Sequence, residues 1–302
     1  MNKINLLVNH NDFNTFQSIY LNPILSEYFN FLIFEENTTY DRSSTIIVTN
    51  CLNSTPWFKR LEGLKVVVDN LWEQYRPTSI PNALVIFNKN FFWYNECLWY
   101  TALDHNKYVP NKTYDKLAFI PMRSKRPHRD LIFDKLTPYL KSCVYSYSSR
   151  GIVLPGDTDQ SHPEYDRHFN PYWYDSTYFS LVAESSVNDE KEIFITEKSF
   201  KPMAFYHPYM IFGQKGILAR LKILGFETYD NIFDESYDLL EHADQRATNI
   251  LNNIKNFKYE KYDKLTLDKL EYNHQRFFNK DLVIEKIKKE IIEPILEFAN
   301  GQ

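Results

Sequence analysis

The feature that most constrains the fold is a series of short apolar runs, separated by polar segments, in the first third of the chain. Five such runs occur, at Ile4–Val8, Phe31–Phe34, Thr45–Val48, Leu64–Val68 and Ala83–Phe87. Several are continuous rather than alternating, which is typical of strands buried on both faces of a parallel sheet. The stretches between them, such as residues 13–29, are able to form helices. This alternation predicts a layered α/β domain.

A second set of strand-like runs follows, and helices close the chain. The runs lie at residues 117–121, 143–147, 178–183, 193–195 and 209–212. Apolar spacing predicts helices at residues 129–140, 239–257, 265–278 and 282–298. Residues 151–177 lack periodicity and are expected to form an ordered loop. Two Rossmann-like α/β domains, residues 1–110 and 111–302, are the simplest architecture, with ligands bound at the carboxyl ends of the strands.

Charge and cysteine content exclude several classes of protein. With 43% hydrophobic and 25% charged residues, the composition is that of a soluble globular protein. A net charge of −4 argues against non-specific coating of nucleic acid, yet residues 111–150 hold nine Lys and Arg against three Asp and Glu, which favours a local anion site. Three cysteines without a CxxC pair predict a reducing compartment and no zinc site. No signal peptide or membrane span is recognisable, so a cytoplasmic location is expected.

The basic cluster lies in the segment Met122–Asp130, between an expected strand and an expected helix. Its cationic residues and histidine are Arg123, Lys125, Arg126, His128 and Arg129. A strand-to-helix turn directs backbone N–H groups and the positive end of the helix outward, where a phosphate binds readily. Arginine adds bidentate hydrogen bonds to phosphate oxygens. The alternative is a solvated basic loop.

A second candidate is the segment Phe194–Pro208. Thr196 ends an expected strand and is a suitable helix cap, which places Lys198 in the first helical turn near another anion-attracting end. Glu197 is suited to accept hydrogen bonds from a ribose diol. The alternative is an ordinary capped helix with surface charges. His207, which precedes a proline, either contacts a phosphate or is a buried structural histidine.

These two segments together resemble the donor half of nucleotide-sugar glycosyltransferases of the GT-B architecture, in particular the α-1,3-fucosyltransferase group. Leu181–Ser185, Phe194–Lys198 and Tyr206–Gly213 follow in that family's order, and Pro127–Phe133 matches its arginine at a helix start. A further similarity, to fucosyltransferase-like proteins often encoded by bacteriophages, rests on a separate set of residues. That set is Lys198, Pro202, His207, Gly225–Thr228 and Asp234–Asp238.

The resemblance implies a GT-B-like fold with two domains facing a cleft. Residues 1–110 would bind the acceptor and residues 111–302 the nucleotide-diphosphate sugar. Arg129 and Lys198 would hold the diphosphate and Glu197 the ribose, and Phe194 replaces the family's tyrosine near the base. Arg126 and Lys201 are further expected donor-binding residues.

The resemblance also implies the reaction, an inverting transfer of a hexose or pentose to a hydroxyl group without a metal or cofactor. Fixed cations would stabilise the diphosphate as it leaves. A carboxylate would deprotonate the acceptor, and the candidates are Asp69 and Glu73, with Asp12 and His10 as alternatives. Asp157-Thr-Asp159 is the alternative metal site.

The acceptor and the catalytic competence are open. The acceptor is expected to be a glycan or, if a phage encodes the protein, a hydroxymethylated base of DNA in the host cytoplasm. The Tyr- and Trp-rich segment Tyr165–Tyr178 either floors the acceptor site or covers the core. A non-catalytic nucleotide- or glycan-binding protein that retains the fold is the alternative to an enzyme.

Overall fold

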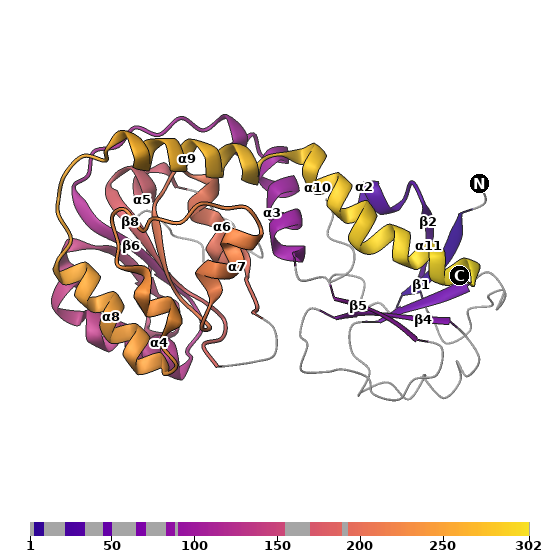
Figure 1. Ribbon diagram of the computed structural model, residues 1–302, viewed down its shortest axis with the longest axis horizontal. Helices are drawn as coiled ribbons and strands as arrows, with labels where there is room; N and C mark the ends of the chain where they lie inside the picture. The colour runs from indigo at the N-terminus through magenta and orange to yellow at the C-terminus, as the bar shows by residue number, and fades with distance from the viewer. Residues whose placement is uncertain are drawn as a thin grey trace. The chain divides into compact units, whose positions relative to one another are not determined.

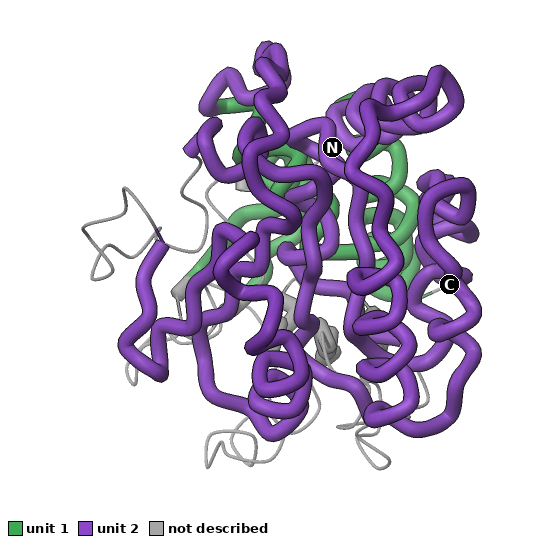
Figure 2. Tube along the Cα trace, turned by 90° about the vertical axis from the view of Figure 1, so that its left-hand side faces the viewer, with its two compact units in different colours: residues 1–102, 279–302 green, residues 103–278 purple. Residues whose placement is uncertain are grey.

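The computed structural model describes residues 3–8, 22–33, 45–49, 65–70, 83–87, 90–154, 170–188 and 193–301. The chain divides into two compact units, which are coloured separately in Figure 2. Unit 1 comprises Met1–Ala102 and Asn279–Gln302, and unit 2 comprises Leu103–Phe278. Each unit contains a parallel sheet, which confirms the expected α/β fold class.

The sheet of unit 1 has five strands in the order β2-β1-β3-β4-β5 (Figure 1). The strands are β1 Ile4–Val8, β2 Phe29–Ile33, β3 Thr45–Thr49, β4 Lys65–Asn70 and β5 Ala83–Phe87. All neighbouring pairs are parallel. The five apolar runs of the sequence are therefore strands, with ends shifted by at most two residues.

The C-terminal helices belong to unit 1. They are α10 Lys280–Ile287, a π-helical turn at Lys288–Ile292 and α11 Glu293–Asn300, and they contact β5 and α3 Phe91–Ala102. Ile287, Ile291 and Ile295 form a buried stripe at four-residue spacing. The carboxylate of Glu290 in the π-helical turn accepts a hydrogen bond from the hydroxyl of Tyr94 at 2.5 Å. This grouping differs from the expected division, which placed residues 279–302 with the second domain, because helical periodicity does not say which sheet a helix covers.

The sheet of unit 2 has four parallel strands in the order β7-β6-β8-β9. They are β6 Lys116–Met122, β7 Val144–Tyr147, β8 Thr177–Ala183 and β9 Tyr209–Phe212. Helix α4 Pro127–Leu136 connects β6 to β7, and α6 Glu197–Ala204 connects β8 to β9. Right-handed crossovers that run in opposite directions from the sheet centre place α4 and α6 on opposite faces. Helix α8 Ala243–Lys255 packs against α4, and α9 Lys264–Phe277 packs against α6 (Figure 1).

Two local expectations for unit 2 are wrong. Residues 193–195, which were expected to form a strand, have no regular secondary structure. Within this segment, Phe194 N donates to the side chain of Gln214 at 2.7 Å, and directly after it Thr196 N donates to the side chain of Glu184 at 3.0 Å. The loop expected at residues 151–177 contains helix α5 Pro171–Asp175, whose N-cap Asn170 accepts a hydrogen bond from Tyr172 N.

The order of the strands locates the expected ligand site. The direction in which the chain adds strands reverses between β6 and β8, and ligands of open α/β sheets bind at such a switch point, beyond the carboxyl ends of the strands. Among the described residues, no helix is long and apolar enough to cross a membrane.

Candidate functional site

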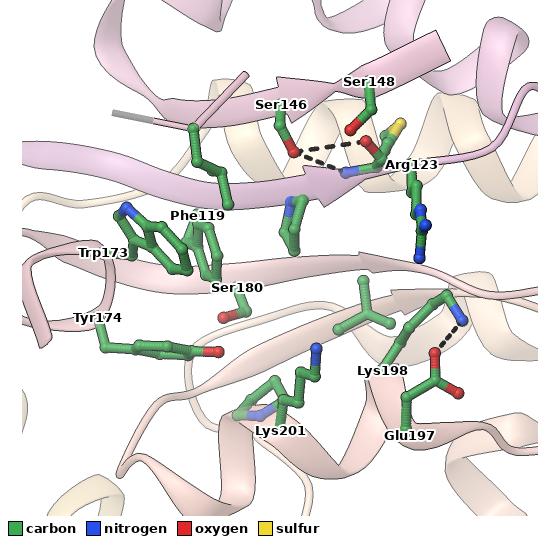
Figure 3. A pocket seen from close by; sticks show the side chains of 15 residues that line it. Phe119, Arg123, Ser146, Ser148, Trp173, Tyr174, Ser180, Glu197, Lys198 and Lys201 are labelled. Carbon is green, nitrogen blue, oxygen red and sulfur yellow. Dashed lines mark hydrogen bonds and ion pairs between the residues drawn. The ribbon is translucent and has the colours of Figure 1, made fainter. Parts of the chain in front are cut away.

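A pocket of about 80 Å³ lies at the switch point of unit 2 (Figure 3). Its walls come from β6 and the residue after it, the end of β7, β8, α5 and the first two turns of α6. The pocket therefore occupies the position that the topology predicts. Its volume is below the 300–1,000 Å³ of a site that encloses a whole drug-sized ligand.

Three aromatic rings lie together on one side of the pocket (Figure 3). Phe119 of β6 stacks on Trp173 of α5, with ring centroids 5.6 Å apart, and meets the edge of Tyr174 at 5.0 Å. All three side chains are buried. Within the described part of the Tyr- and Trp-rich segment, Trp173 and Tyr174 therefore cover the core, which is one of the two alternatives left by the sequence, and they also line this pocket.

Three serine hydroxyls face the same space. Ser146 Oγ accepts a hydrogen bond from Met122 N at 3.3 Å, and Ser180 Oγ lies 2.6 Å from His207 Nδ1. The buried Ser148 Oγ has no hydrogen-bond partner among the residues that the structure describes. A buried hydroxyl without a partner is costly, so Ser148 is a ready contact for a polar ligand atom.

His207 is a structural histidine. Its Nε2 donates to the carbonyl of Thr177 at 3.0 Å, which leaves Nδ1 to accept from Ser180. Burial lowers the pKa of His207 well below its ordinary value, and nearby Lys112 lowers it further. Both ring nitrogens are occupied by protein groups, which favours the structural alternative over a phosphate contact.

Charged residues from two segments surround the rest of the pocket. Among the described residues of its lining, Arg123, Lys198 and Lys201 are cations and Glu197 is the one carboxylate. Figure 3 shows Arg123 extending from the end of β6 toward the part of α6 where Lys198 and Glu197 form an ion pair. Burial alone would raise the pKa of Glu197, but Lys198 and then Lys201 outweigh it, so the pKa is lowered and the carboxylate stays ionised. The net charge of this lining is positive, as an anionic ligand requires.

Arg129 lies outside the lining. It is buried, and its Nη1 and Nη2 donate to the backbone carbonyls of Ser124 at 3.0 Å and Glu184 at 3.3 Å. Its Nε has no hydrogen-bond partner among the described residues. Burial lowers the pKa of Arg129, and the nearby Glu184 partly offsets this. In this geometry Arg129 holds the β6–α4 turn against the end of β8.

The other residues expected at the donor site also divide into those that line the pocket and those that lie outside it. Lys198, Lys201 and Glu197 come together in the pocket, whereas Arg126 is an exposed N-cap of α4 and Phe194 is half-buried outside the lining. The expected bases are in unit 1. Asp69 lies in β4, paired with Ile86, and its side chain is not described, while Glu73, Asp12, His10 and the Asp157-Thr-Asp159 segment fall outside the described residues.

The sequence interpretation included Glu184 in the matched segment Leu181–Ser185 but gave it no role, and the structure shows it as a fully buried carboxylate just beyond β8. Its Oε1 accepts from Thr196 N at 3.0 Å and Ser199 Oγ at 2.5 Å. Its Oε2 accepts from Thr196 Oγ1 at 2.6 Å and Ser185 N at 3.0 Å. The signal was present in the sequence, because an acid directly follows the apolar run Leu181–Ala183 at the end of the strand. Within the described part of the chain, no group of three or more His, Cys, Asp or Glu side chains is placed to hold a metal ion.

No protein-family model matches the sequence, and no curated protein matches it at the sequence level. Among solved structures, a crystal structure of an α1,3-fucosyltransferase is similar, with a TM-score of 0.55 and 12% identity over 99% of this chain and 90% of that chain. An α1,3-fucosyltransferase structure with GDP-fucose has a TM-score of 0.45 and 11% identity over 92% of this chain and 91% of that chain. At such low identity the likeness concerns the fold alone. This chain has a GT-B fold like that of an α1,3-fucosyltransferase.

Proposed function

We propose that the protein is a glycosyltransferase that takes a sugar from a nucleotide-diphosphate donor and transfers it to a hydroxyl group. The observation that carries the proposal is the pocket of unit 2, where an aromatic floor, serine hydroxyls and three cations meet at the switch point of a parallel sheet. That combination suits a ligand with a flat or apolar ring at one end and a diphosphate at the other.

In the proposed complex the diphosphate lies near the start of α6. Lys198 and Lys201 of that helix and Arg123 of the facing segment supply positive charge, and the positive end of the helix dipole adds to it. The ionised Glu197 accepts hydrogen bonds from the ribose diol. Arg129 does not contact the ligand in this proposal, but it holds the turn that follows Arg123.

The proposed reaction exchanges one C–O bond for another. The bond between the anomeric carbon and the diphosphate breaks, the acceptor oxygen forms the new bond, and the acceptor proton passes to a carboxylate. The leaving diphosphate gains negative charge in the transition state, so fixed cations stabilise it there more than in the ground state. Asp69 and Glu73 remain the proposed bases, and inversion without a metal remains the proposed course.

A glycan is the preferred acceptor. The net charge of −4 disfavours a long polyanion such as DNA, whose binding relies on neutralised phosphates. A modified DNA base is the second acceptor to test. The transferred sugar is a hexose or a pentose, and the proposal fits both equally.

A thermal-shift panel of GDP-, UDP- and CMP-sugars tests the donor site. A donor at about a hundred times its dissociation constant adds about 2.7 kcal/mol to the free energy of unfolding. We expect one nucleotide class to stabilise the parent and the Lys198→Ala variant to lose that response. Lys222→Ala is the matched control, because Lys222 also forms an ion pair with a glutamate, Glu235, but lies outside the pocket.

The outcomes separate the alternatives. If no nucleotide sugar stabilises the parent, the donor-site proposal is wrong. If a donor binds but no sugar reaches any glycan or hydroxymethylated DNA acceptor, the protein is a nucleotide-sugar-binding protein that retains the fold.

A further inference from the structure

Glu184 connects the two segments that supply the charged side chains of the pocket. Arg123 comes from the β6–α4 segment, and Glu197, Lys198 and Lys201 come from α6. The carboxylate of Glu184 binds the start of α6, and its backbone carbonyl binds the start of α4. The two walls of the pocket are thus attached to a single residue at the end of β8.

The attachment to α6 is saturated. Four donors converge on the two carboxylate oxygens, which is about the full acceptor capacity of an ionised carboxylate. Two donors are the backbone N–H and hydroxyl of Thr196, the N-cap of α6, and one is the hydroxyl of Ser199 in its first turn. The Thr196 side chain makes no capping bond to the helix itself, so Glu184 fixes the helix start from outside.

The attachment to α4 uses the carbonyl oxygen. His128 Nε2 donates to it at 2.9 Å and Arg129 Nη2 at 3.3 Å. Arg129 also donates to the carbonyl of Ser124, the residue after Arg123. Both segments are therefore held by the same residue, and a change at Glu184 affects the position of each.

We infer that Glu184 is the positioning residue of the proposed donor site, which sets the separation between Arg123 on one wall and Lys198 on the other. The inference rests on the proposed function, and Glu184 itself does not line the pocket. Supporting residues hold the side chains of a binding site in their productive positions. Losing Glu184 should therefore weaken the contacts to every part of the ligand together, whereas losing Lys198 should weaken the phosphate contacts alone.

Glu184→Gln is the direct test, because it keeps the shape and removes one acceptor oxygen. Whichever way the amide is turned, its NH₂ group faces a backbone N–H, of Thr196 in one orientation and of Ser185 in the other. We expect the affinity for the nucleoside diphosphate that binds best among GDP, UDP and CDP to fall about tenfold. The ratio of diphosphate to monophosphate affinity, and the dependence of binding on salt, should stay as in the parent. Lys198→Ala should instead lower both the diphosphate-to-monophosphate affinity ratio and the salt dependence of binding.

Ser199→Ala provides a second route if Glu184→Gln fails to fold. It removes a single donor to Glu184 and lies outside the pocket lining. Its control is Ser176→Ala, another buried serine of unit 2, whose hydroxyl donates to the carbonyl of Tyr172. We expect weaker diphosphate binding for Ser199→Ala and parental binding for Ser176→Ala.

The results distinguish failure of the proposed function from failure of the positioning role of Glu184. A parent that binds none of the three diphosphates overturns the proposed function and this inference with it. A parent that binds, together with Glu184→Gln and Ser199→Ala variants of unchanged affinity, overturns the positioning role alone. A loss confined to the diphosphate-to-monophosphate ratio in Glu184→Gln also overturns it, because such a loss indicates a local charge effect.

Discussion

The hydroxyl of Ser180, on the pocket wall, donates a hydrogen bond to Nδ1 of the fully buried His207 at 2.6 Å. Ser148, which also lines the pocket but follows β7, has a buried hydroxyl without a partner among the described residues. One serine therefore serves the protein, and the other is available to a ligand. This difference separates the cost of each hydroxyl for folding from its value for binding.

Exchanging each serine for alanine measures this difference. Ser180→Ala leaves the Nδ1 atom of His207 unsatisfied and should lower the free energy of unfolding by about 1–3 kcal/mol. Ser148→Ala removes an unsatisfied hydroxyl and should leave the unfolding free energy unchanged or raise it by about 1 kcal/mol, while it weakens donor binding. Urea unfolding and donor titration of both variants check this. A Ser148→Ala variant as unstable as Ser180→Ala would contradict the assignment.

The ion pair between Lys198 and Glu197 predicts a change in titration. Burial opposes ionisation of Glu197, and Lys198 is the largest influence that lowers its pKa. Lys198→Met should therefore raise the pKa of Glu197, which carboxyl ¹³C shifts report as a function of pH without ligand. Lys222→Met, which removes a lysine outside the pocket, is the control and should leave the Glu197 titration as it is in the parent.

Stability should fall with acid through His207. The folded pKa of His207 is lowered, so below pH 6.5 the unfolded chain binds a proton that the folded protein does not. The stability that depends on a neutral His207 is present above that pH and is lost below it. Between pH 7.5 and 5.5 the loss is about 1.4 kcal/mol. The difference in unfolding free energy between the parent and His207→Gln should shrink by that amount, and a constant difference would contradict a neutral buried imidazole.

Gly225 is expected to matter for folding. It has a φ of 84°, and a Cβ there would collide with the guanidinium of Arg276, which donates to the carbonyl of Leu224. Gly225→Ala should cost about 3 kcal/mol, from the left-handed backbone and the displaced arginine together. Gly151→Ala is the matched control, because Gly151 has a φ of 73° with open space around it and should cost only about 1 kcal/mol. Thermal unfolding of the two variants compares them, and equal losses would rule out a role for Arg276.

Local sequence pattern was sufficient for most elements. The apolar runs of the first third formed strands because their pattern is a property of adjacent residues. Helices α4, α8, α9, α10 and α11 lie largely where apolar spacing predicted helices, and α6 follows the expected cap Thr196. The segment at residues 193–195 shows the limit of such reasoning. Its residues favour a strand, but the backbone N–H of Phe194 donates to the side chain of Gln214, and the N–H of Thr196, which follows the segment, donates to the side chain of Glu184.

The sequence by itself determined the two α/β halves and the residues of α6 that meet in the pocket, because apolar periodicity and helix starts are properties of adjacent residues. Only the tertiary structure decided that Arg129 turns inward, that Arg123 faces the pocket and that residues 279–302 complete unit 1. These outcomes depend on the order of strands. Pairing of β6 with β8 brings residue 129 to within hydrogen-bonding distance of residue 184, 55 positions away, and no local pattern encodes that pairing.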